Sequence, residues 1–130
     1  MRTQAREAVF KYLFSTLFVE NDEELFAVLS QELNEKDKAF ANELLKLIST
    51  NKEKLLSLIE DLAVGYKLNR LYNADKCALM IGMTELEFYK ETDIPIIIDE
   101  AVKLCSKFST EKSPDFVNGI LAKYSKTIGR

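Results

Sequence analysis

The 130 residues predict an all-α fold, a single compact domain spanning residues 1–130 with six or seven helices. Three observations lead to this prediction. Apolar residues recur along most of the chain at the i, i+3, i+4 spacing of helices. The one run typical of a strand, Ile96-Ile97-Ile98, has no candidate partner strand. The length suits one domain, and 47% hydrophobic with 30% charged residues is typical of a globular protein.

The N-terminal half contains four predicted helices. The first begins near Ala5, and its apolar residues cover so much of the helix surface that we expect most of its sides to be buried. The second begins at residues 21–24, where acidic side chains suit the positive end of the helix dipole. The third runs from about residue 37 to 48, and the polar Ser49-Thr50-Asn51 segment should separate it from a fourth helix over about residues 52–62.

The C-terminal half contains three more. One covers about residues 73–89, and its Gly82 predicts close approach of a neighbouring helix, because glycine otherwise costs a helix about 1 kcal/mol relative to alanine. In the segment Asp93-Ile94-Pro95, proline stands in an opening helical turn, where its missing N–H does no harm. The segment Ser113-Pro114-Asp115 fits the N-cap and first two positions of a last helix.

Charge is unevenly distributed. The net charge of −3 argues against nucleic acid, since phosphate binding requires a positive surface. Both ends of the chain are nevertheless basic. Residues 1–19 have three bases against one acid (+2), and residues 103–130 have six bases against two acids (+4). If the two ends meet in space, they form a positive patch on an acidic body.

Several classes of function are disfavoured. Cys77 and Cys105 lie within apolar patterns, so we expect reduced core residues rather than a disulfide or a metal site. There is no histidine, no glycine-rich phosphate loop and no nucleophile motif, so we expect neither an enzyme nor a bound metal or cofactor. No segment has the length of a membrane span or the pattern of a signal peptide, so we expect a cytoplasmic protein.

Segments along the chain resemble one family. Residues 94–109, IPIIIDEAVKLCSKFS, and residues 113–124, SPDFVNGILAKY, are similar to the NusB signature, a helix with INEAVELAKxF followed by SxxFVNGVL. Residues 2–8 resemble the family's RxxARExA opening, and residues 70–86 its RL, D, IL and EL segment. The resemblance therefore covers nearly the whole chain, and only residues 20–50 contribute little beyond helical pattern.

The resemblance implies a bundle of two packed sub-bundles that performs no chemistry. It implies binding of single-stranded boxA RNA, found in ribosomal and phage leader transcripts, together with NusE, a small-subunit ribosomal protein. The complex acts on the RNA polymerase elongation complex with other Nus factors. The implied RNA-binding residues are Arg2, Gln4, Arg6, Lys112 and Phe116, and the candidates for the protein-partner surface are Asn69, Asp75 and Lys76.

Alternatives remain for these residues and for the function. Arg2 and Arg6 suit a phosphate site at a helix N-terminus, but are also compatible with solvated charges. Phe116 suits base stacking, but is also compatible with the core. We interpret Asn118 as a buried hydrogen-bonding group and Gly119 as a packing residue. A protein-binding scaffold without RNA, and a stand-alone relative of the NusB-like domain of RNA methyltransferases, are the alternative functions.

Overall fold

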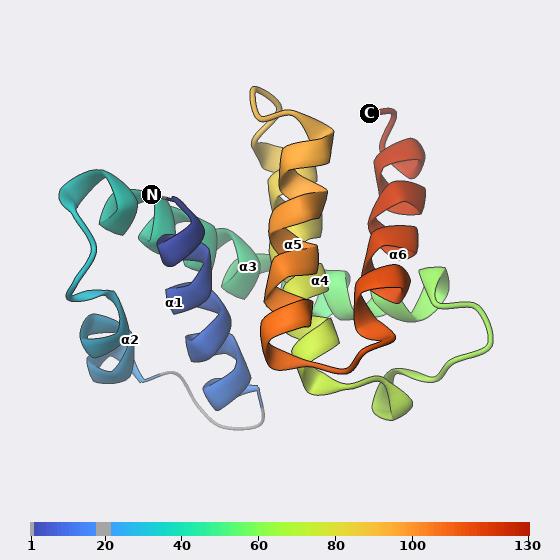
Figure 1. Ribbon diagram of the computed structural model, residues 1–130, viewed down its shortest axis with the longest axis horizontal. Coiled ribbons are helices and arrows are strands. Elements are labelled where there is room, and N and C mark those ends of the chain that lie inside the picture. Colours follow the sequence, from blue (N-terminus) through green and yellow to red (C-terminus); the bar gives the residue numbers. More distant parts are fainter. Residues whose placement is uncertain (1, 18–21) are drawn as a thin grey trace.

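The computed structural model describes residues 2–17 and 22–130, and in these residues it is helical without a strand (Figure 1). The prediction of an all-α fold is confirmed. Asn21, in the predicted start of the second helix, lies outside the described residues. No helix in the described part is long and apolar enough to cross a membrane. The elements are α1 (Arg2–Thr16), α2 (Glu23–Ser30), α3 (Glu35–Leu62), the 3-10 turn η1 (Leu68–Arg70), α4 (Asn73–Phe88), α5 (Ile94–Phe108) and α6 (Ser113–Thr127).

The predicted break at residues 49–51 is wrong, because α3 is one continuous helix of 28 residues. Asn51 does not cap a new helix; its side-chain amide donates to the carbonyl of Leu47, 2.8 Å away, within the same helix. Ile48 and Leu55, seven residues apart, are both buried, so one apolar face continues through the polar segment. Burial of that face outweighs the weak preference of serine, threonine and asparagine for helix ends.

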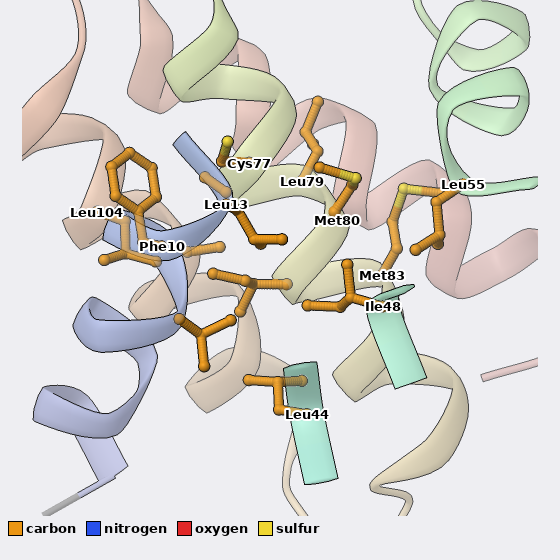
Figure 2. Packing of buried hydrophobic residues seen from close by; sticks show 14 of the residues in the cluster. Phe10, Leu13, Leu44, Ile48, Leu55, Cys77, Leu79, Met80, Met83 and Leu104 are labelled. Carbon is orange, nitrogen blue, oxygen red and sulfur yellow. The ribbon is translucent and has the colours of Figure 1, made fainter. Parts of the chain in front are cut away.

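The helices form two groups joined by α3. In Figure 1, α1 and α2 lie on one side, α4, α5 and α6 pack against one another on the other, and α3 passes between the groups. Helix α4 is central, and its residues from Ala74 to Leu86 are buried on every side. Figure 2 shows Met80 and Met83 of α4 close to Ile48 and Leu55 of α3.

Two expectations about the core are confirmed. A Cβ added to Gly82 would lie 2.7 Å from Cδ1 of Leu121, so glycine allows α6 to approach α4 closely. Cys77 and Cys105 are free and buried. Burial raises the pKa of each thiol to about 12, so both stay protonated at neutral pH.

The connection between α4 and α5 is held by Arg130. Its guanidinium donates to the carbonyl oxygens of Leu86, at 3.0 Å, and Lys90, at 3.1 Å, and also to that of Thr92. These carbonyls are left without helical partners where α4 ends and α5 has not begun. Arg130 therefore fastens the end of α6 to the connection between α4 and α5.

Candidate nucleic-acid interface

Arg6 lies inside the protein, between α1, α4 and α5. It is 3% exposed, and its guanidinium makes two hydrogen bonds to the buried carboxylate of Glu85, at 2.8 and 2.6 Å. A second carboxylate, that of Glu100, lies 3.5 Å from the same guanidinium. Charges are buried in proteins when they are paired in this way. The predicted phosphate contact of Arg6 is therefore not supported by its position, and we assign Arg6 to the attachment of α1.

Arg2 and Gln4, in the first turn of α1, are exposed. The guanidinium of Arg2 lies 4.3 Å from the ring centroid of Phe40, a distance typical of a cation–π contact. No carboxylate pairs with Arg2 in the described part of the chain, so its charge stays open to an anion. The hydroxyl of Thr3 donates to Glu100 at 2.7 Å and fixes this turn against α5.

Lys112 and Phe116 lie at the start of α6, the positive end of its helix dipole. The N–H groups of Ser113 and Phe116 already donate to the carbonyls of Thr110 and Lys112, and Pro114 has none, so the charge of Lys112 is the main attraction for an anion here. Lys112 is exposed, and no ion pair involves it among the described residues. Phe116 is half-buried, and its ring meets the ring of Tyr66 edge to face, with centroids 5.9 Å apart. The ring is therefore neither a pure core residue nor fully free, and part of it faces solvent.

Ser113 does not cap α6 as predicted. It lies inside the helix, 2% exposed, and its hydroxyl accepts from the N–H of Thr110 and donates to the carboxylate of Asp75 at 3.1 Å. The hydroxyl of Ser109 donates to the same carboxylate at 2.7 Å. Asp75 thus joins the start of α4 to the α5–α6 connection, because a buried carboxylate needs hydrogen-bond donors around it.

The three candidates for a protein-partner surface differ in exposure. Asn69 is exposed on η1. Asp75 and Lys76 are 3% and 7% exposed, and the ammonium of Lys76 donates to Asn73 at 3.4 Å. A partner could not reach the two buried charges without displacing their neighbours, so the position of Asp75 and Lys76 does not support direct contact.

The two basic ends of the chain do not form one patch. Arg6 bonds Glu85 and Ser113 bonds Asp75, ten residues apart on α4, which corresponds to about 15 Å along the helix. The basic C-terminal segment does touch α1, but through Lys107, whose ammonium pairs with Glu7 at 2.7 Å. Among the predicted RNA-binding residues, the two unpaired cations therefore lie in two separate regions, Arg2 at the start of α1 and Lys112 at the start of α6.

Sequence reasoning missed residues beside Phe116. Tyr66, Arg70 and Tyr72 line a hollow together with it, and their number within seven residues is the signal that could have indicated them. The interpretation of the neighbouring motif was also wrong. Asn118 and Gly119 are exposed, and a Cβ at Gly119 would meet no atom within 4 Å, so neither residue packs helices together.

Fold and surface together define a small all-helical protein that presents unpaired cations and accessible aromatic rings. In its described part, no group of three or more potential ligand side chains comes together to hold a metal ion. Residues 3–126 match the NusB family, and the chain belongs to that family.

Known relatives are similar to this chain in length and in structure. The transcription antitermination protein NusB of Carboxydothermus hydrogenoformans is 36% identical over 135 residues, which covers 98% of this chain and 94% of the relative. The solved structure of T. maritima NusB superposes with a TM-score of 0.90 at 33% identity, over 97% of this chain and 91% of the other. A crystal structure of the antitermination factors NusB and NusE in complex with dsRNA contains a chain with a TM-score of 0.85 and 30% identity, over 97% and 96% of the two chains.

Proposed function

We propose that this chain is a cytoplasmic transcription antitermination factor that acts by binding, not by catalysis. It binds single-stranded boxA-type leader RNA together with NusE, and the complex acts on RNA polymerase during ribosomal RNA synthesis. Membership of the NusB family and the relative that was crystallised with NusE and dsRNA support the binding of RNA together with NusE. The observation on this chain that carries it is the start of α6, where the unpaired Lys112, the helix N-terminus and the accessible ring of Phe116 lie together.

The chemistry of single-stranded RNA fits these groups. Unstacked bases bind to aromatic faces, while phosphates bind to cations and free backbone N–H groups. Arg2 and Gln4 provide a second contact at the start of α1. Arg2 lies beside Tyr89, and Ser113, the neighbour of Lys112, bonds Asp75. Tyr89 and Asp75 are fourteen residues apart, about 21 Å at the helical rise, a length that about six stacked nucleotides cover at 3.4 Å each. One short RNA segment is therefore long enough to touch both.

The experiment is a binding titration with a boxA-type RNA and a scrambled RNA, with and without NusE, at several salt concentrations. We expect preference for the boxA-type RNA, and binding tightened by NusE by about 1–3 kcal/mol of coupling. The double variant Arg2→Ala/Lys112→Ala should reduce the slope of log affinity against log salt by about 0.7 for each phosphate that the protein no longer neutralises.

Lys126→Ala is the matched control. Lys126 is exposed on the last turn of α6, fourteen residues beyond Lys112 and so about 21 Å away, and its replacement should leave the slope unchanged. Binding that ignores RNA sequence and NusE would contradict the proposal. Binding of NusE with no RNA binding at all would favour the protein scaffold instead.

A further inference from the structure

A hollow of about 540 Å³ lies between α2 and the first half of α3, beside α1. In Figure 1, α2 lies at the edge of the molecule, on the far side of α1 from α6. Helix α2 packs against α1, and α3 packs against α1 and α4, but α2 and α3 have no comparable packing against each other within the described residues. The hollow is therefore a groove between two helices, the α2–α3 groove. Its volume is in the range of about 300–1,000 Å³ that ligand sites occupy.

Two buried aromatic rings line the α2–α3 groove, those of Tyr12 and Phe26. They meet edge to face, with centroids 5.3 Å apart. The hydroxyl of Tyr12 also accepts from the backbone N–H of Asp22, the residue that caps α2, at 2.9 Å. These contacts hold the start of α2 against α1, so the groove is formed before any ligand arrives.

Four polar side chains of the groove have no partner. Glu23 and Gln31 belong to the start and the C-cap of α2, and Lys38 and Asn42 belong to α3. None of these four side chains makes a hydrogen bond or an ion pair with another residue that the structure describes. They are therefore available to a ligand that lies along the groove.

The two amides indicate an extended protein segment as this ligand. A side-chain amide both donates and accepts, so it can pair with the N–H and C=O of a peptide group. The backbone groups inside a helix already bond one another, whereas those of an extended segment are free to bond to Gln31 and Asn42. Glu23 and Gln31 are eight residues apart, about 12 Å along the helix, a length that about four extended residues cover at about 3.3 Å each.

The charge around the groove favours a basic segment. Residues 22–47, which form α2 and the first half of α3, contain seven acids and three bases, a balance of −4. Glu23, Glu24 and Glu32 are exposed, and no cation pairs with them in the described part of the chain. Such a surface repels the phosphates of RNA and attracts lysine and arginine. The groove is therefore complementary in charge to a basic protein segment and not to a nucleic acid.

We propose that the α2–α3 groove binds a basic, extended segment of a partner protein. A lysine or arginine of this segment pairs with Glu23, and its backbone bonds to Gln31 and Asn42. An apolar side chain of the segment packs on the rings of Tyr12 and Phe26. The inference goes beyond the proposed function, because none of the residues that line the groove is a predicted RNA-binding residue.

The test is a selection of random heptapeptides displayed on phage against the full-length protein. Enriched peptides are then synthesised, and their affinity is measured by fluorescence polarisation. We expect them to carry lysine or arginine close to apolar residues. Glu23→Gln removes one exposed ion pair and should weaken their binding about twofold to fivefold. Ala27→Phe places a ring in the groove from an exposed position on α2 and should abolish binding.

Two control variants keep the same chemistry outside the groove. Val28→Phe adds a ring at the next residue of α2, which is 59% exposed and does not line the groove. Glu32→Gln removes an exposed acid that also lies outside the lining. Both controls should bind the peptides within about twofold of the wild type. Thermal unfolding is measured for every variant, and where Ala27→Phe lowers the melting temperature, Glu23→Gln decides the test.

Three results of the peptide measurements would overturn the inference and leave the proposed function intact. They are no enrichment of any peptide, enriched peptides without a cation, and equal peptide binding by Glu23→Gln and the wild type. RNA affinity, measured on the same variants, should stay unchanged. A loss of RNA affinity in folded Ala27→Phe, with Val28→Phe unaffected, would place the groove in the RNA-binding surface and would also overturn the inference.

Discussion

Replacing Arg6 by methionine should lower the free energy of unfolding by about 3–5 kcal/mol. The reason is the carboxylate of Glu85, which is fully buried and receives two hydrogen bonds from Arg6. Without the guanidinium, this carboxylate is a buried charge with no partner, which costs far more than the lost attraction alone. Methionine keeps most of the apolar volume of the side chain, so the effect of a cavity is small.

The loss is large in proportion to the stability of such a protein. At about 0.05–0.15 kcal/mol per residue, a chain of 130 residues is stable by about 7–20 kcal/mol. Its unfolding entropy of about 2.1 cal/mol/K per residue means that each kcal/mol lowers the melting temperature by about 4 °C. The variant should therefore melt about 11–18 °C below the wild type. Urea denaturation followed by circular dichroism measures the free energy directly.

The double variant Arg6→Met/Glu85→Met removes both charges and should recover most of this stability, because apolar residues of similar volume replace a buried pair at little cost. The single variant, where folded, should keep the salt dependence of RNA binding, because Arg6 is not accessible to phosphate. A loss of less than about 1 kcal/mol in Arg6→Met, or a flattened salt slope, would refute the assignment of Arg6 to the fold.

Three further predictions concern packing and burial. Gly82→Ala should lower the free energy of unfolding by about 1–3 kcal/mol in urea denaturation, because the new Cβ lies 2.7 Å from a side chain of α6. Gly119→Ala, whose Cβ meets nothing within 4 Å, should raise it by about 0.5–1 kcal/mol. Equal effects of the two changes would contradict the difference in packing. The thiols of Cys77 and Cys105, with their pKa raised to about 12, should react with a thiol reagent at pH 8 only after unfolding. Arg130→Ala should cost about 1.5 kcal/mol and speed amide exchange in the α4–α5 connection, and unchanged exchange would argue against its role there.

Much of the fold followed from local pattern. The 3.6-residue period of apolar positions, the two prolines in opening turns and Gly82 on α4 all express rules that act within a few residues. These predicted the all-α class, and α4, α5 and α6 begin and end within a few residues of the expected positions. The predicted break at Ser49-Thr50-Asn51 failed because it weighed local capping preference without the apolar face that α3 buries on both sides of it.

The candidate site depended on the tertiary structure. Sequence reasoning located Lys112 and Phe116 at the start of α6, yet it could not separate the exposed Arg2 from the buried Arg6, four residues later on the same helix. Nor did it indicate that Asp75 is buried or that Tyr66 and Phe116, fifty residues apart, touch. The helical period of apolar residues depends only on residues close together in the chain, so it can be recognised in a single sequence. Whether a charge is buried, paired or open to a ligand depends on which distant elements pack against it, and only the folded arrangement decides that.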